Sequence, residues 1–269
     1  MDISLILSSI RALPLQEFIA SACDNCRDPS RVEIIIVIDR DNEEMLNVYN
    51  NKKWRACPIK INFIVLDNPE GYFGGGHRDN TGVMASHPDS YFVQIVNDKL
   101  RFTCKNWDDK YMSYKNSFDD DVFVVRMSSN KDNTQVRVTV PNSHNLSSFH
   151  LLQTPENFRL YTKKMYNLLE GAGDFWATDT WHEPILAYLE ELHHKNRQIK
   201  CDVEIFDKAG EEVGTHNSDP DKYDIAGKRM VELDEPQYHT YTYKRIAKKI
   251  SDYITIERLN SDKAISTSR

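Results

Sequence analysis

The stretch Val32-Glu33-Ile34-Ile35-Ile36-Val37-Ile38-Asp39 is the part of the sequence that decides the fold. Its β-branched residues follow one another with almost no polar interruption, which is typical of a strand covered on both faces. Asp39-Arg40-Asp41-Asn42 ends this strand, and residues 43–50 predict a helix after it. Residues 15–26 predict a helix before it. A buried strand between two helices is the unit from which parallel sheets are built.

Three further strands are predicted in the first hundred residues, over 3–7, 59–66 and 91–96. Strands separated by crossovers of helical length form a mainly parallel sheet with helices on both faces. We therefore predict an α/β fold. Ligands of such sheets bind beyond the carboxyl ends of the strands. Polar residues follow each strand at that edge: Ser8 and Ser9, Asp39 and Asp41, Asp67 and Asn68, and Asn97 and Asp98.

After Leu100 the alternation becomes irregular, which predicts a smaller antiparallel or irregular part. Thr154-Pro155-Glu156 has the residues of a helix start, with Thr as the N-cap and an acid in the first turn. The remaining patterns predict strands over 122–127, 135–140 and 203–206, helices over 154–170, 183–194 and 243–256, a polar segment over 210–227, and frayed residues over 260–269.

Composition excludes several classes of protein. The chain has 269 residues and a net charge of −7, which argues against a dedicated nucleic-acid binder because such proteins need a basic surface. No apolar run approaches the roughly 20 residues that span a bilayer, and the N-terminus does not resemble a signal peptide. The five cysteines, with Cys23 and Cys26 on one helix, do not resemble a disulfide framework. We expect a reduced, cytoplasmic protein.

Two segments carry chemistry. Gly71-Tyr72-Phe73-Gly74-Gly75-Gly76-His77-Arg78 leads from a strand into a helix, an arrangement whose backbone amides and arginine can approach phosphate. The alternative is a flexible surface loop. Asn97-Asp98-Lys99 follows the fourth strand, where a carboxylate beside an amide suits Mg²⁺ or Mn²⁺ bound to a diphosphate. The alternative is an ordinary turn, in which Asn and Asp are favoured.

Taken together, three pieces resemble the family 2 glycosyltransferases of the GT-A fold. They are the strand ending in Asp39, then Arg78-Asp79-Asn80-Thr81-Gly82, then Ile95-Val96-Asn97-Asp98. The resemblance covers residues 3–101 in the family's order and, more faintly, 158–189. The chain departs from the family at Asn97, which replaces the first acid of the metal motif, and at His182, which replaces the first residue of an acidic pair.

The resemblance implies a role for each candidate residue. Ser8, Asp39, Arg78 and Asn97 would bind the nucleotide. Asp98 would hold a divalent metal, manganese or magnesium, with His216 as a late ligand; the alternative for His216 is a solvent-facing position. Glu183 would be the catalytic base and Asp179 the reserve candidate, although Glu183 is also suited to the start of a helix.

The function that this resemblance implies is transfer of a sugar from a nucleotide-activated donor to the hydroxyl of a glycan or another acceptor. Residues 1–101 would form the nucleotide-sugar half of one catalytic domain and 102–269 the acceptor half with a C-terminal helical extension. Two alternatives stay open. One is a nucleotidylyltransferase, against which the lack of glycine in Ser8-Ser9-Ile10-Arg11 counts. The other is a non-catalytic nucleotide-binding module.

Overall fold

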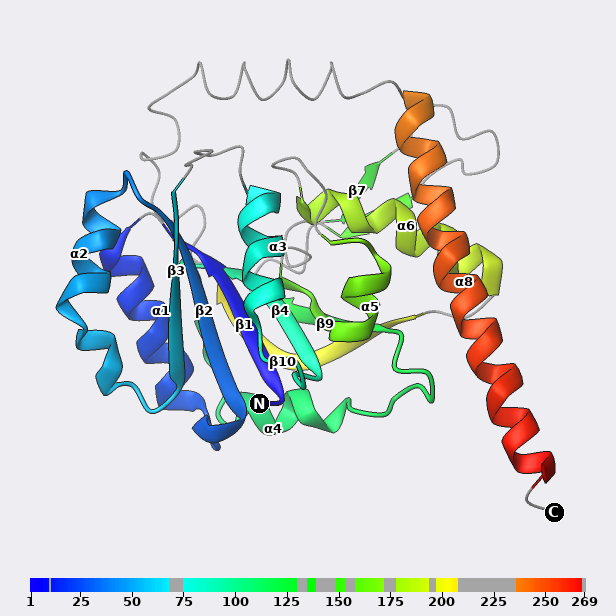
Figure 1. The fold of residues 1–269 in the computed structure, drawn as a ribbon, viewed down its shortest axis with the longest axis horizontal. Helices are drawn as coiled ribbons and strands as arrows, with labels where there is room; N and C mark the ends of the chain where they lie inside the picture. Colours follow the sequence, from blue (N-terminus) through cyan, green and yellow to red (C-terminus); the bar gives the residue numbers. More distant parts are fainter. Residues whose placement is uncertain are drawn as a thin grey trace.

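The first half of the fold is a set of four parallel strands. In the computed structural model they are β1 (Ile3–Ser8), β2 (Val32–Asp39), β3 (Lys60–Leu66) and β4 (Phe92–Asn97), in the order β3-β2-β1-β4. The N-terminus lies at the lower end of β1 in Figure 1, so the carboxyl ends of these strands point upward there. The structure describes residues 1–9, 11–67, 75–129, 135–138, 149–152, 158–171, 178–193, 197–207 and 236–267.

Four further strands extend the same sheet beyond β4, to eight strands within the described residues. β9 (Leu160–Thr162) pairs antiparallel with β4 and with β6 (Val124–Ser129), and β10 (Gln198–Asp207) is parallel to β6. β5 (Leu100–Phe102) closes the edge, antiparallel to β10. A separate pair consists of β7 (Gln135–Val138) and β8 (Phe149–Leu152). The predicted fold class, a mainly parallel sheet with a smaller antiparallel part, is confirmed.

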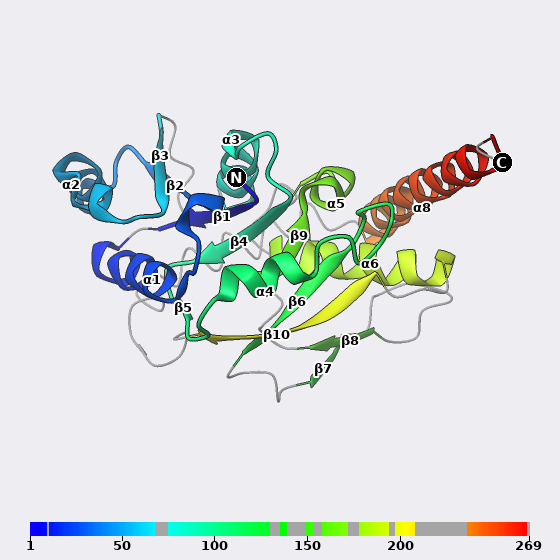
Figure 2. The same cartoon turned by 90° about the horizontal axis from the view of Figure 1, so that it is seen from below.

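Two layers of helices cover the sheet and give it two cores (Figure 2). One core contains α1 (Ala12–Asn25), α2 (Glu43–Asn51) and α4 (Trp107–Ser113). The other contains α3 (Gly75–Ala85), α5 (Lys163–Leu168), α6 (Thr178–His193) and α8 (Pro236–Thr267). Short 3-10 turns, η1 (Pro29–Arg31) and η2 (Lys53–Ala56), precede β2 and β3.

Both faces of β2 are apolar, so this strand needs a helix layer on each side of the sheet. Ile34 and Ile36 lie in the core beneath α1, and Ile35 and Val37 lie in the core beneath α3, all of them 0–1% exposed. An apolar strand of this kind is stable only when both faces are removed from water. The prediction from the Val32–Asp39 stretch is therefore confirmed.

The second half differs from the sequence prediction in several elements. Residues 160–162 form β9 where a helix was expected, because they pair with β4 and β6. α5 begins after Thr162, whose hydroxyl accepts the Met165 N–H at 3.1 Å, and the predicted helix start at Thr154 lies outside the described residues. α6 begins at Thr178, so Pro184 lies inside it. α8 continues to Thr267 through residues that we expected to be frayed. None of the helices in the described residues is long and apolar enough to cross a membrane.

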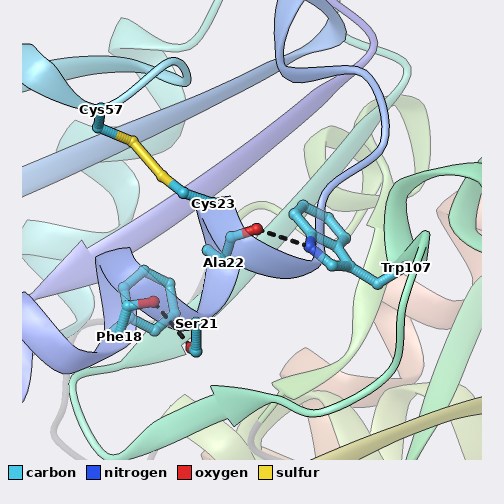
Figure 3. Close-up of a disulfide and its surroundings, with 6 residues drawn as sticks. All are labelled: Phe18, Ser21, Ala22, Cys23, Cys57 and Trp107. Carbon is cyan, nitrogen blue, oxygen red and sulfur yellow. Dashed lines mark hydrogen bonds between the residues drawn. A yellow bond between two sulfur atoms is a disulfide. The ribbon is translucent and has the colours of Figure 1, made fainter.

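The cysteine prediction is wrong for one pair. Cys23 of α1 forms a disulfide with Cys57, which lies between η2 and β3 (Figure 3). Figure 3 also shows the Trp107 indole, whose N–H donates to the carbonyl of neighbouring Ala22 at 3.0 Å. The two cysteines are 34 residues apart, and only the packing of α1 on the sheet brings them together. Cys26, Cys104 and Cys201 are free thiols.

Close packing fixes α3 on the sheet. A Cβ atom added to Gly82 would lie 2.3 Å from the Cγ2 methyl of Ile6 in β1, a distance that side chains do not tolerate. Ile6 is itself 0% exposed, so its methyl has little room to move. Glycine at position 82 therefore sets how closely α3 approaches β1.

We expect Gly82→Ala to lower the free energy of unfolding by about 1–3 kcal/mol, the usual cost of overpacking a core. Urea denaturation measures this difference. Gly75→Ala is the matched control in the same helix, because a Cβ at Gly75 meets nothing within 4 Å. The control should be neutral or stabilising by up to about 1 kcal/mol. Equal stability of the two variants would contradict the close approach of α3 to β1.

Candidate active site

The register of the parallel strands brings three predicted residues to one edge. Ser8, the last residue of β1, lies opposite Val37 of β2 on one side and opposite Asn97 of β4 on the other. Asp39 follows Val37 by two residues and ends β2. Ser8, Asp39 and Asn97 therefore lie on neighbouring strands at the carboxyl edge of the sheet, as predicted.

Arg78 reaches the same edge from α3. Its guanidinium donates to Oδ2 of Asp39 at 3.0 Å, and the two side chains are only 10% and 11% exposed. The other oxygen of Asp39, Oδ1, is buried and has no hydrogen-bond partner among the described residues, and the same is true of the Ser8 hydroxyl. A buried polar atom without a partner costs about 1–3 kcal/mol, so such atoms call for a ligand.

Asp98 has protein partners on both carboxylate oxygens. The Ser9 hydroxyl donates to Oδ2 at 2.8 Å, and a guanidinium nitrogen of Arg11 lies 3.7 Å from Oδ1. The Arg101 guanidinium donates to the backbone carbonyl of Asp98 at 2.6 Å and fixes the turn that follows β4. In the same turn, the Asn97 side-chain oxygen accepts the Lys99 N–H at 2.9 Å.

These contacts test the expected metal site. Asp98 is the expected ligand, and His216 lies outside the described residues. No group of three His, Cys, Asp or Glu side chains that could hold a metal ion occurs in the part of the chain that the structure describes. The donor set around Asp98, a carboxylate already bonded to a hydroxyl and beside an arginine, does not fit a metal centre.

The predicted catalytic residues lie on α6. Asp179 and Glu183 are one helical turn apart near its beginning, and their side chains are outside the described part. Glu183 was expected at the start of the helix, but α6 begins five residues earlier, so Glu183 lies inside it. Its neighbour His182 is 1% exposed and faces the core.

His182 joins three elements of the second half. Its Nε2 lies 2.8 Å from the carbonyl oxygen of Gly171, and its Nδ1 lies 2.7 Å from the Tyr161 hydroxyl. Because a carbonyl only accepts, Nε2 carries the proton and Nδ1 accepts from Tyr161. Burial, with a smaller contribution from nearby Arg159, lowers the pKa of His182 to about 3, although the hydrogen bond to Gly171 opposes this shift. This neutral histidine positions α6.

Asn80 of α3 connects the two halves of the protein. Its side-chain oxygen accepts from the Tyr166 hydroxyl at 2.9 Å, and burial holds the pKa of that tyrosine far above its ordinary value. Gly171 has a φ of +84°, and a Cβ there would lie 2.4 Å from the same Asn80 oxygen. In the Arg78–Gly82 stretch, Asn80 and Gly82 therefore hold structure while Arg78 reaches the site edge.

The sequence prediction missed Ser9 and Arg11 as partners of Asp98. The signal available was their place directly after the first strand, at the edge where ligands bind. Their partner is 89 and 87 residues away along the chain, and no local pattern relates residues so far apart.

Comparison with known proteins defines the fold class. No protein-family model and no curated protein matches the sequence. Among solved structures, S. aureus TarS 1–349 in complex with UDP is similar, with a TM-score of 0.55 and 16% identity over 77% of this chain. This chain spans 60% of that TarS chain. TarS 1–349 with UDP-GlcNAc has a TM-score of 0.54 and 14% identity, over 93% of this chain and 72% of that chain.

A third similar structure is the mannosyltransferase PcManGT from Pyrobaculum calidifontis in complex with GDP-Man and Mn²⁺. It has a TM-score of 0.51 and 10% identity, over 98% of this chain and 80% of that chain. These structures are GT-A-type glycosyltransferases, and the chain has the GT-A fold. At such low identity the likeness establishes the fold.

The buried His182 predicts a pH dependence of stability. The unfolded state takes up a proton near its ordinary pKa of 6.5, whereas folded His182 does so only near pH 3. In this range the unfolded state binds more protons, so stability falls as the pH falls. Between about pH 7.5 and 5.5 we expect His182 to contribute a loss of about 1 kcal/mol.

Urea denaturation at the two pH values measures this loss. His182→Gln should be less stable at pH 7.5 and should lack this part of the pH dependence. His77→Gln, which changes an exposed histidine of α3, is the control and should retain it. An unchanged pH dependence in His182→Gln would show that position 182 does not titrate as proposed.

Proposed function

We propose that this chain is a glycosyltransferase that moves a sugar from a nucleotide-activated donor to an acceptor hydroxyl. The observation that carries the proposal is a pair of buried atoms that have no hydrogen-bond partner among the described residues, Asp39 Oδ1 and Ser8 Oγ, at the edge that Arg78 also reaches. The GT-A fold supports it, because TarS and PcManGT were solved with UDP, UDP-GlcNAc and GDP-Man.

In this proposal the edge binds the nucleoside. Asp39 Oδ1 accepts a hydrogen bond from an N–H of the base or from a ribose hydroxyl. Arg78 holds the other oxygen of Asp39, which fixes the orientation of the carboxylate and offsets its charge. Ser8 and Asn97, which are opposite each other in the sheet, bind the ribose hydroxyls. We assign residues 1–101 to this half and 102–269 to the acceptor half of one catalytic domain.

Glu183 is the proposed base. In an inverting reaction its carboxylate accepts the proton of the acceptor hydroxyl as the oxygen attacks the anomeric carbon. The new C–O bond forms while the bond from that carbon to the phosphate oxygen breaks, and the nucleoside diphosphate leaves with the electron pair. Asp179 is the reserve candidate, one turn earlier on α6. The buried bonds of His182 keep this part of α6 in place.

The divalent metal and the cytoplasmic location that the sequence suggests remain predictions. A divalent ion, such as the Mn²⁺ in the PcManGT structure, would have to displace Arg11 from Asp98 in order to bind there. A cytoplasmic location is also a prediction, and the Cys23–Cys57 disulfide counts against it, because reducing compartments keep most cysteines as thiols.

The nucleotide site is tested by binding. Calorimetry with UDP, GDP, CDP and dTDP should find at least one that binds. Asp39→Asn should then weaken that binding by about 10–100-fold, the effect of losing a charged hydrogen bond. Asp67→Asn is the matched control: it follows β3 at the same edge, but its side chain is 73% exposed and pairs with Arg40. Equal losses in both variants would move the nucleoside elsewhere.

The reaction is tested by its products. A panel of nucleotide sugars should yield a nucleoside diphosphate, whereas release of pyrophosphate would indicate a nucleotidylyltransferase. Glu183→Gln should lower turnover by about 10²–10⁴-fold, the usual contribution of a general base, with donor affinity unchanged. If turnover survives in Glu183→Gln and falls in Asp179→Asn, the base is Asp179. Loss of donor affinity in Glu183→Gln would instead indicate that this acid belongs to the nucleotide site.

A further inference from the structure

The carboxylate at the end of β4 is neutralised by an arginine of the same chain. Asp98 is 9% exposed, its Oδ2 accepts the Ser9 hydroxyl at 2.8 Å, and its Oδ1 lies 3.7 Å from the Arg11 guanidinium. Ser9 and Arg11 both belong to the segment that joins β1 to α1. A divalent cation at Oδ1 would be repelled by a guanidinium so close to it. In this chain the cation beside Asp98 is therefore the guanidinium of Arg11.

Two other polar groups near Asp98 also have hydrogen-bond partners within the chain. The Asn97 oxygen accepts the Lys99 N–H, which closes the turn after β4. The N–H of Ala12, the first residue of α1, donates to Oε1 of Glu44 at 2.5 Å, so we do not assign a phosphate to the start of α1. The group at this place best suited to a diphosphate is the side chain of Arg11, which is 21% exposed.

We propose that Arg11 takes the charge-compensating role of a divalent metal in this chain, so that a nucleoside diphosphate binds without a divalent cation. This inference rests on the proposed function. A guanidinium carries five N–H donors in one plane, so it can bridge a carboxylate and a phosphate. Asp98 then acts as a positioning residue: with Ser9 it holds Arg11 at the edge where Ser8 and Asn97 meet.

The first test is nucleoside diphosphate binding by calorimetry in EDTA and in Mn²⁺, with the nucleotide that the wild-type chain prefers. We expect the two wild-type dissociation constants to agree within about threefold. Arg11→Gln should weaken binding in EDTA by about 10–100-fold, and Mn²⁺ should restore part of it because Asp98 has lost its arginine. Arg40→Gln is the matched control, an arginine at the same edge that is 64% exposed and pairs with Asp67, and it should bind like wild type.

A second pair of variants separates this inference from a metal site. The Asp98→Asn variant should still bind the nucleotide in EDTA, because in this proposal Asp98 does not act as a metal ligand. If Asp98 were a metal ligand, the same variant would lose the nucleotide binding that Mn²⁺ supports. Arg11→Lys should retain more affinity than Arg11→Gln, because it keeps the charge without the planar donors. Thermal unfolding of each variant without nucleotide identifies any loss of fold.

The outcomes are distinguishable. If wild-type binding of the nucleotide requires Mn²⁺, the inference is wrong and the proposed function stands. The same conclusion follows if Arg11→Gln binds the nucleotide in EDTA as tightly as wild type. Absence of nucleotide binding in both buffers overturns the proposed function and the inference together. Equal wild-type affinities in both buffers, with loss in Arg11→Gln and retention in Arg40→Gln, support the role of Arg11.

Discussion

The rest of the structure depends on the parallel pairing of β1 between β2 and β4. The register places Ser8 opposite both Val37 and Asn97, so the three strand ends form one edge. Since each of these strands is apolar on both faces, the register cannot slip without moving buried side chains from one core into the other. The contact of Gly82 with Ile6 then fixes α3, and with it Arg78, relative to that edge. The site is thus a consequence of how the core packs.

Three acids at the ends of β2, β3 and β4 each have an arginine partner. Asp39 pairs with Arg78, Asp67 with Arg40, and Asp98 with Arg11. An edge of unpaired carboxylates would repel a diphosphate, and a divalent cation is one way of removing that repulsion. Here the charges that compensate the two buried acids, Asp39 and Asp98, are the arginines Arg78 and Arg11 of the chain itself. The two buried pairs, at Asp39 and Asp98, also lose less to screening by salt than the exposed pair at Asp67.

The two halves are joined by contacts that lie far from the proposed chemistry. β9 pairs with both β4 and β6, so one continuous sheet joins the four parallel strands of the first half to the strands of the second half. Asn80 packs against the turn at Gly171, and His182 binds the carbonyl of that same glycine. The beginning of α6, which carries Asp179 and Glu183, is therefore tied through a single turn to the helix that carries Arg78. A displacement of α3 or of α6 would therefore shift the other helix as well.

The sequence by itself determined the elements whose signals are local. The β-branched run of β2 and the polar residues after each strand predicted the parallel sheet and the place of Ser8, Asp39 and Asn97 at its edge, and the glycine-rich segment predicted that Arg78 lies near them. Only the tertiary structure decided the partners. β9 is a strand because β4 and β6 flank it, His182 faces the core because Tyr161 and Gly171 accommodate it there, and Cys23 meets Cys57 through the packing of α1. The arginine partner of the strand-end acid Asp98 was decided in the same way, because Arg11 and Asp98 are 87 residues apart and meet only when β1 and β4 pair. Propensity acts over a few residues, whereas these contacts exist only once distant segments have packed.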